Sequence, residues 1–229
     1  MLKKLPTDPF ARTQHTKDVI HKLRMDILLG VFEPDSYLVE NQLAQDLGVS
    51  RGPIRTALQN LEQEGLVKSL PNGRTIVTGF SVKAAEDIFD LRLMLEKRAL
   101  ELIIANEMVD YFPILSVVDQ IREINNANKI EDLTATFSTV DIQFHRSIMI
   151  MSENQAILQA WNLMANTLYA VLTISNNTFY TDFFEYFKTH KALSDLIIQR
   201  NPAVIQTITD HINDAKELVI KKLKDRLKS

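Results

Sequence analysis

Four side chains that can bind a metal ion fall on positions that we expect to face the interior of helices. Asp141 and His145 are four residues apart, so on a helix they lie one turn apart and point at one spot. They share their helix face with the apolar residue Phe137. His190 and His211 each lie on the apolar stripe of a later predicted helix. Three of the chain's five histidines are therefore expected in the core, with a carboxylate beside one of them.

These residue types form a ligand set of one oxygen and three nitrogen donors. A buried charge is costly unless it is paired or bound to an ion, so the group needs polar partners or a metal. The set suits Zn²⁺, and also Ni²⁺, Mn²⁺ or Fe²⁺. Around an octahedral ion it would leave positions open for water or for the carboxylate of a bound molecule. The alternative, taken residue by residue, is that each histidine is a hydrogen-bonded core residue without a metal.

Arg92 and Glu96 are a further charged pair, one turn apart on the first helix predicted for the C-terminal part. Arg92 lies next to the apolar stripe that we expect this helix to bury, namely Ile88, Leu91, Leu95 and Ala99. Two interpretations stay open for Arg92. It binds the carboxylate of an effector, or it forms an i,i+4 ion pair with Glu96 at the surface.

A third set of residues has the chemistry for contacting DNA. Arg51, Arg55 and Gln59 are spaced one turn apart, on the face opposite the apolar residues of a predicted helix. Arginine binds guanine edges with two hydrogen bonds or grips phosphate. Arg74 lies at the tip of a predicted hairpin and could reach the DNA backbone or a minor groove. The alternative is that these side chains are solvated and that the fold serves protein contacts.

The glycines divide the chain into two predicted domains. All six lie at or before Gly79, so residues 1–79 are expected to consist of short elements and turns. Residues 80–229 contain no glycine and only two prolines, which indicates helices joined by short connections. We therefore predict a mostly α-helical protein, in which a winged helix-turn-helix is followed by an all-helical bundle.

The elements of the first domain follow from apolar spacing and turn residues. Residues 1–15 are predicted to form a flexible arm, and residues 16–29 a helix. A short helix ends at Gly48, and a second helix starts with Ser50 as its N-cap. The Asn-Gly pair at Asn72 predicts a hairpin turn. In helix-turn-helix proteins the second helix enters the major groove of DNA.

The second domain is predicted to contain six helices. Their apolar residues recur with helical spacing, and the four possible metal ligands lie on the third, fifth and sixth of them. We place the helices at residues 82–107, 112–128, 131–152, 154–175, 178–199 and 202–227.

The composition is that of an ordinary globular protein. Of 229 residues, 45% are apolar and 24% charged, and the formal net charge is −3. The absence of cysteine excludes disulfides and thiolate ligands, and it suits a reducing compartment. The first ten residues lack the apolar stretch of a secretory signal, and no apolar run approaches the ~18 residues of a membrane span. We expect a cytoplasmic protein that does not contact membranes.

The first domain resembles a known family. Residues 33–77 contain PDSYLVE, LAQDLGVSRGPIRTALQNLEQEGLV and LPNGRTIV, and these phrases are similar to the DNA-binding domain of GntR-type bacterial transcription regulators. The resemblance implies that Arg51 and Arg55 contact operator DNA. The sequence departs from the family pattern in having Asp35 where glycine follows proline, Tyr37 where a basic residue is common, and Gly73-Arg74 in reversed order at the wing tip.

The second domain is similar, over about residues 81–225, to the FCD ligand-binding domain of FadR-like GntR regulators. The similarity rests on D-x-x-F-H from Asp141 to His145, on His190 and on His211. In metal-containing members an aspartate and three histidines hold the ion inside a helical bundle, which implies a metal at these four positions. The Arg92-x-x-x-Glu96 pair also resembles the family's first FCD helix.

Together these features predict a homodimeric transcription regulator, a repressor, that binds a roughly palindromic double-stranded operator. A small carboxylate effector bound beside the metal would change operator affinity. Two alternatives stay open. The helical domain is a metal-dependent hydrolase or oxygenase, or the metal is purely structural. Against an enzyme, no second Asp or Glu falls on the inner faces of the third, fifth or sixth helix.

Overall fold

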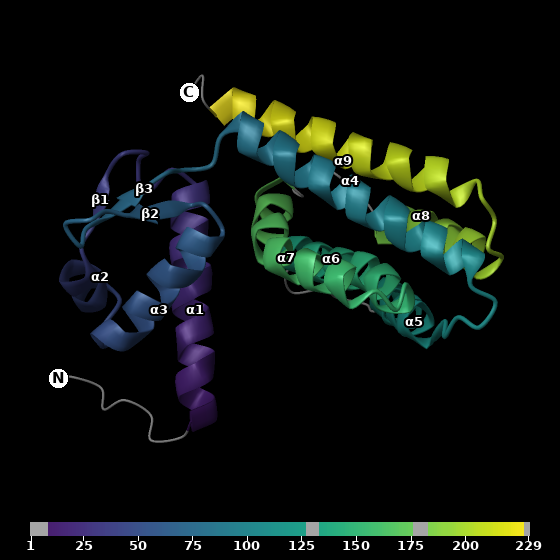
Figure 1. Cartoon of the computed structure of the whole chain (residues 1–229), viewed down its shortest axis with the longest axis horizontal. Coiled ribbons are helices and arrows are strands. Elements are labelled where there is room, and N and C mark those ends of the chain that lie inside the picture. Colours follow the sequence, from purple (N-terminus) through teal and green to yellow (C-terminus); the bar gives the residue numbers. More distant parts are fainter. Residues whose placement is uncertain (1–8, 127–132, 176–182, 227–229) are drawn as a thin grey trace. The chain divides into compact units, whose positions relative to one another are not determined.

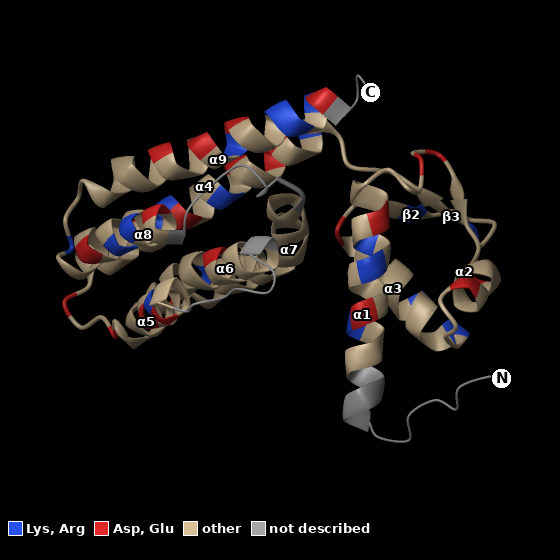
Figure 2. Cartoon of the chain, turned by 180° about the vertical axis from the view of Figure 1, so that it is seen from behind, with Lys and Arg blue, Asp and Glu red and all other residues tan. Residues whose placement is uncertain are grey.

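The computed structural model describes residues 9–126, 133–175 and 183–226. The chain divides into two compact units, and the boundary in the sequence lies between Phe80 and Ser81. The first unit combines helices with a small sheet, and the second is entirely helical where it is described (Figure 1). Basic and acidic residues both occur on α1, α4 and α9, whereas α7 carries neither (Figure 2). Within the described residues, no helix is long and apolar enough to cross a membrane.

The first unit is a winged helix-turn-helix, as predicted. It runs α1 (Pro9–Leu28), β1 (Tyr37–Leu38), α2 (Glu40–Asp46), α3 (Arg51–Gln63), β2 (Val67–Ser69) and β3 (Thr75–Val77). The strands form an antiparallel sheet in the order β1-β3-β2, with the β2–β3 hairpin as the wing. Gly73 in the hairpin turn has a φ of 77°, a conformation that favours glycine.

One local prediction for this unit needs correction, and one strand was not predicted. The flexible arm predicted for residues 1–15 is wrong from Pro9 onward, because α1 begins there, and residues 1–8 lie outside the described part. The first turns of α1 lack the apolar spacing that we used to locate helices, so they were missed. Pro9 is nevertheless a residue type that is common at the first position of a helix. Ser50 is the N-cap of α3, as predicted, although its side chain makes no capping hydrogen bond. Strand β1 was not predicted, because two residues form a strand only through pairing with β3.

The inner face of α3 packs against α1. Ile54, Ala57 and Leu61 of α3 are completely buried, and Leu23 of α1 is 1% exposed. An ion pair accompanies this contact, because the Arg24 guanidinium of α1 donates to both oxygens of one carboxylate, that of Glu64, at 2.7 and 2.6 Å. This two-hydrogen-bond geometry satisfies both buried charges. The exposed face of α3 is thereby held away from α1.

In residues 81–126, 133–175 and 183–226, the second unit has the six helices that were predicted. They are α4 (Val82–Ala105), α5 (Phe112–Asn126), α6 (Leu133–Met151), α7 (Gln155–Ser175), α8 (Phe183–Ile198) and α9 (Val204–Arg226). The predicted limits at residues 128, 131, 178 and 227 lie outside the described residues.

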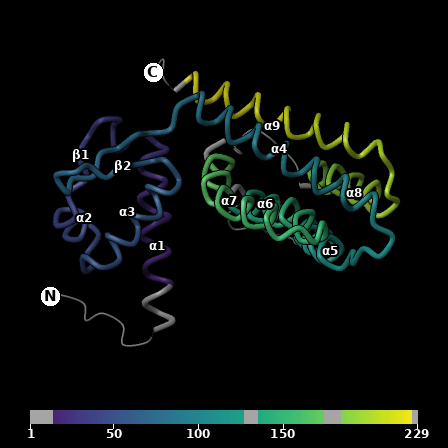
Figure 3. Tube along the Cα trace, viewed as in Figure 1, coloured from purple at the N-terminus to yellow at the C-terminus, as the bar shows by residue number. Residues whose placement is uncertain are grey.

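Long helix pairs build the bundle. The traces of α4 and α9 run side by side, and α6 packs along α7 (Figure 3). Phe144 and Ile148 of α6, Trp161 of α7 and Ile212 of α9 have no exposed surface. The core therefore lies between α6 and the helices around it. The side chains of Asp141, His145, His190 and His211 lie in this core.

Candidate metal centre and nucleic-acid interface

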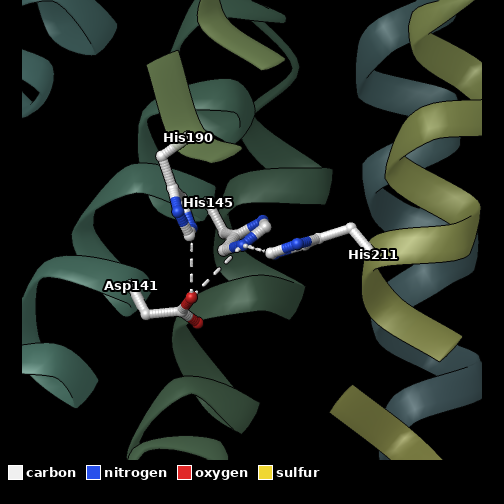
Figure 4. A group of neighbouring side chains, drawn as sticks. All are labelled: Asp141, His145, His190 and His211. Carbon is white, nitrogen blue, oxygen red and sulfur yellow. Dashed lines mark hydrogen bonds and ion pairs between the residues drawn. The ribbon is translucent and has the colours of Figure 1, made fainter. Parts of the chain in front are cut away.

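The structure brings the four predicted metal ligands together. Asp141 and His145 project from α6, His190 from α8 and His211 from α9, and the side chains converge (Figure 4). One ligand atom of each lies within 4.8 Å of all the others. His145 and His190 have no exposed surface, and Asp141 is 9% exposed.

The distances between ligand atoms match those around a single metal ion. Asp141 Oδ1 lies 3.3 Å from His190 Nε2 and 3.7 Å from His145 Nε2. The Nε2 atoms of His145 and His211 are 3.3 Å apart. Two donors that each sit about 2.1 Å from one ion are about 3.0 Å apart at a right angle and about 3.4 Å apart in a tetrahedron. The closest ligand atoms are therefore spaced much as donors around one ion are, and all four lie within 4.8 Å of one another.

Two histidines are oriented by partners on the far side of their rings. His145 Nδ1 lies 2.6 Å from Glu96 Oε2, and His190 Nδ1 lies 3.0 Å from the carbonyl oxygen of Tyr186. Both partners are acceptors, so each Nδ1 carries a proton, and in its neutral form each ring would present the Nε2 lone pair to the cluster. That lone pair of His190 faces a carboxylate oxygen, an arrangement that a cation between the two would stabilise.

Burial and neighbouring charges favour the metal-binding protonation states of Asp141, His190 and His211, but not that of His145. Burial alone would raise the pKa of Asp141, but His145, His190 and Arg92 together outweigh it and hold this pKa well below its usual range. Burial lowers the pKa of His190, and burial together with the other two histidines lowers that of His211 strongly. Burial also acts to lower the pKa of His145, but Glu96 and Asp141 raise it overall. A charged carboxylate and neutral imidazoles are the forms that bind metals.

The residues predicted to contact DNA lie on an exposed face of the first unit. Arg51, Arg55 and Gln59 of α3 are all exposed. Glu40, the first residue of α2, accepts hydrogen bonds from Arg51 Nη2 at 3.0 Å and from Arg55 Nε at 2.9 Å. Burial acts to raise the pKa of Glu40, but these two hydrogen bonds outweigh it and lower the pKa. One carboxylate thus holds both arginines in fixed positions.

The wing continues this face. Arg74 is exposed, and its guanidinium carbon lies 5.4 Å from the ring centre of Tyr37. A cleft of about 550 Å³ separates the wing from the start of α3. It is lined by Tyr37, Leu38, Val39, Glu40, Asn41, Arg51, Gly73, Arg74 and Thr75. Two arginines, Arg51 and Arg74, therefore line one concave surface.

Comparison with known families decides what kind of protein carries these two sites. Residues 15–77 match the model of bacterial regulatory proteins of the gntR family, and residues 87–214, more than half of the chain, match the FCD domain model. The chain is a GntR-family transcription regulator with an FCD domain. Because the family and the relatives are transcription regulators and not enzymes, the alternative of a metal-dependent enzyme is excluded.

Named relatives of this GntR-family regulator include the gluconate operon transcriptional repressor of Bacillus subtilis (strain 168), which is 28% identical over 88% of this chain and 83% of the relative. The repressor of the same name from Bacillus licheniformis is 30% identical over 67% of this chain and 62% of the relative. Among solved structures, Lar, which controls the Listeria monocytogenes agr system, superposes with a TM-score of 0.68 at 14% identity, covering 96% and 99% of the two chains. E. coli McbR/YncC gives 0.59 at 16% identity over 90% and 97%. These structures share the fold.

In this GntR-family regulator the first bundle helix buries a different face from the one predicted. Leu91 is 42% exposed, whereas Arg92 and Glu96 are 1% and 0% exposed. The buried stripe includes Ala85, Phe89, Arg92, Glu96, Ala99 and Ile103. The prediction followed apolar residues alone, so it included Ala99 correctly but placed Arg92 beside the buried stripe and not within it. The charges are tolerated there because Arg92 Nε donates to Glu96 Oε1 at 2.8 Å.

Two consequences follow for the residues around the metal ligands. The predicted ion pair between Arg92 and Glu96 forms, but in the core and not at the surface. Glu96 also orients His145, a role that sequence reasoning missed because it looked for acids on the ligand-bearing helices only. The regular spacing of Phe89, Arg92, Glu96 and Ala99 was the signal that could have revealed it.

Proposed function

We propose that residues 1–79 bind double-stranded operator DNA, and that residues 80–229 bind a metal and a small carboxylate effector that changes operator affinity. The protein acts as a cytoplasmic repressor and a homodimer, so its operator is roughly palindromic. The observation that carries the proposal is the four-ligand cluster with its oriented histidines in the domain joined to a winged helix-turn-helix.

The exposed arginines support DNA binding through α3. Arg51 and Arg55 are held by Glu40 and are ready to make paired hydrogen bonds to guanine or contacts to phosphate. Gln59 lies one turn further along the same face and can read adenine. Arg74 extends the contact to the wing. Preorganised arginines lose less side-chain entropy on binding DNA.

The donor set supports a divalent transition metal held by Asp141, His145, His190 and His211. Zn²⁺ suits it best, and Ni²⁺, Mn²⁺ and Fe²⁺ also accept these ligands. When bound, the ion supplies a positive charge with open coordination positions, which attracts a carboxylate. The chain's own part is to orient the imidazoles and to keep Asp141 ionised.

Buried donors beside the cluster support an acidic effector. Within the described residues, Arg92 Nη2 has no hydrogen-bond partner, and it lies 3.6 Å from Asp141 Oδ2. Trp161 Nε1 also lacks a partner there, and its ring centre is 5.9 Å from the Arg92 guanidinium carbon. Buried donors normally have a hydrogen-bond acceptor. The carboxylate oxygens of an acidic effector would be suitable acceptors for Arg92 Nη2 and Trp161 Nε1.

The relatives narrow the choice of effector to test. Two of them are repressors of gluconate operons. Gluconate carries a carboxylate next to a hydroxyl group, a pair that can chelate an ion with open positions and also accept hydrogen bonds from Arg92. We therefore propose a hydroxy acid of this type, with gluconate as the first compound to test.

Operator binding with and without effector tests the proposal. Zn²⁺-loaded protein is titrated onto the DNA upstream of its own gene, first alone and then with gluconate or with sorbitol, which lacks the carboxylate. We expect gluconate to weaken DNA binding at least fivefold, as a coupling of ~1–3 kcal/mol gives, and sorbitol to leave it unchanged. The effect should disappear in Arg92→Gln. A gluconate effect that persists in Arg92→Gln would contradict the role of Arg92.

A purely structural ion is the second candidate, because the ligand cluster is almost completely buried. In that case His190→Ala lowers the melting temperature but leaves the response to effector unchanged. Measuring both quantities on the same variant separates the two candidates.

A further inference from the structure

We propose that Tyr37 is a positioning residue for the wing, whose ring holds the Arg74 guanidinium in place for contact with DNA. The inference rests on the proposed DNA-binding function and adds a residue to it. Tyr37 lies on β1, outside both the recognition helix and the hairpin. It therefore connects the strand before the helix-turn-helix to the tip of the wing.

The strand register places the two side chains together. In the antiparallel pair of β1 and β3, Tyr37 lies opposite Ile76 and Leu38 lies opposite Thr75. Side chains alternate between the faces of a sheet, so Arg74, two residues before Ile76, shares the face of Tyr37. Arg74 is its diagonal neighbour, at a spacing that long side chains bridge. The distance of 5.4 Å from guanidinium carbon to ring centre is within the range of a cation–π contact.

The backbone at Arg74 is also fixed. Its amide donates to Asn72 Oδ1 at 3.1 Å, and its carbonyl oxygen accepts from the Leu70 amide at 2.8 Å. With the backbone held, the direction of the Arg74 side chain depends on what its flexible stem contacts. Tyr37 provides that contact, and so reduces the number of rotamers that DNA binding has to freeze.

Tyr37 contributes little to the core, because 53% of its surface is exposed. Its ring lines the same cleft as Arg51 and Arg74. Each of these arginines is held by a separate partner, Arg51 by Glu40 and Arg74 by Tyr37. An exposed aromatic residue that fixes a cation beside other cations fits a surface for a negatively charged partner, and the partner is DNA.

Operator affinity of four variants tests the proposal. We expect Tyr37→Ala to weaken binding about two- to fivefold, the equivalent of one exposed cation–π contact. Tyr37→Phe should bind as the wild type does, because the ring is kept. In Arg74→Ala, the additional change Tyr37→Ala should have no further effect. Equal losses in Tyr37→Phe and Tyr37→Ala, or additive losses in the double variant, would overturn the proposal.

The DNA backbone and the minor groove both present negative potential, and two further measurements separate them. If Arg74 contacts a phosphate, both Tyr37→Ala and Arg74→Ala reduce the slope of log affinity against log salt, by up to about 0.9. If it enters the minor groove, the losses are larger on operators with A·T-rich flanks than with G·C-rich flanks. Either pattern supports the role of Tyr37, and no loss in Tyr37→Ala on any operator overturns it.

The Arg51→Ala, Arg55→Ala double variant keeps this test separate from that of the proposed function. If it binds operator as well as the wild type, the recognition-helix assignment fails. If it loses binding while Tyr37→Ala does not, only the present inference fails. Equal melting temperatures of wild type and Tyr37→Ala would show that the wing is folded in both.

Discussion

The DNA-contact face and the metal cluster use the same charged residue types in opposite environments. Glu40 holds Arg51 and Arg55 at the surface, where the two arginines are 54% and 58% exposed in their side chains. Glu96 holds Arg92 in the core, where both side chains are at most 1% exposed. An exposed pair is weak and can open for another anion, whereas a buried pair is costly to break. The surface site is thus available to a large ligand, and the buried site is preorganised for a small one.

The largest expected difference between the two sites is in folding stability. Glu96→Gln removes the charge that compensates buried Arg92, so we expect the free energy of unfolding to fall by about 3–5 kcal/mol. The matched change Glu40→Gln breaks an exposed pair and should lower it by about 1 kcal/mol or less. Urea denaturation of the two variants beside the wild type measures both. Equal losses would show that burial does not distinguish these pairs.

Metal loading should stabilise only the protein with an intact cluster. Zn²⁺ at a hundred times its dissociation constant stabilises the native state by about 2.7 kcal/mol, and the melting temperature rises accordingly. His190→Ala removes one ligand, so the rise should be lost, together with the bound ion measured by elemental analysis. His15→Ala, a histidine of α1 outside the cluster, is the control and should behave as the wild type. A Zn²⁺ effect that survives in His190→Ala would place the ion elsewhere.

Changes on the DNA-contact face should affect operator binding and leave folding intact. Arg55→Ala removes a solvent-exposed side chain that can pair with guanine, and we expect a loss of ~1–3 kcal/mol in binding free energy. Its melting temperature should match that of the wild type. Fluorescence anisotropy at several salt concentrations gives the affinity. An unchanged affinity would remove Arg55 from the interface.

The smallest expected effect is the pH dependence of the stability that the ion pairs of Glu40 with Arg51 and Arg55 contribute. The pKa of Glu40 is lowered from its ordinary value of 4.5 in the folded protein, so the pair stabilises the fold above that pH. The contribution is lost as the pH falls through the lowered pKa. The small difference in stability between wild type and Glu40→Gln should therefore be present at pH 7 and shrink as the pH falls below 4.5 through the lowered pKa. If the difference in stability between wild type and Glu40→Gln became larger in acid, the pKa of Glu40 would not be lowered in the folded protein.

The sequence-based predictions were accurate where they depended on residues close together in the sequence, and less accurate where they depended on contacts between distant residues. The limits of α3 and the pairing of Asp141 with His145 were predictable, because helix geometry alone relates residues a few positions apart. The buried face of α4 was predicted wrongly, since the partners that make Arg92 and Glu96 tolerable in the core come partly from α6. The start of α1 was missed because its first turns carry no apolar stripe.

The sequence by itself determined the two-domain organisation, the order of the helices and the residue types available for each site. Only the tertiary structure decided which of those residues meet. Glu96 reaches His145 across 49 positions, and His211 reaches it across 66. Tyr37 meets Arg74 only because β1 pairs with β3. Local spacing follows from backbone geometry, but contacts between distant segments depend on how whole helices and strands pack, which a single sequence does not display.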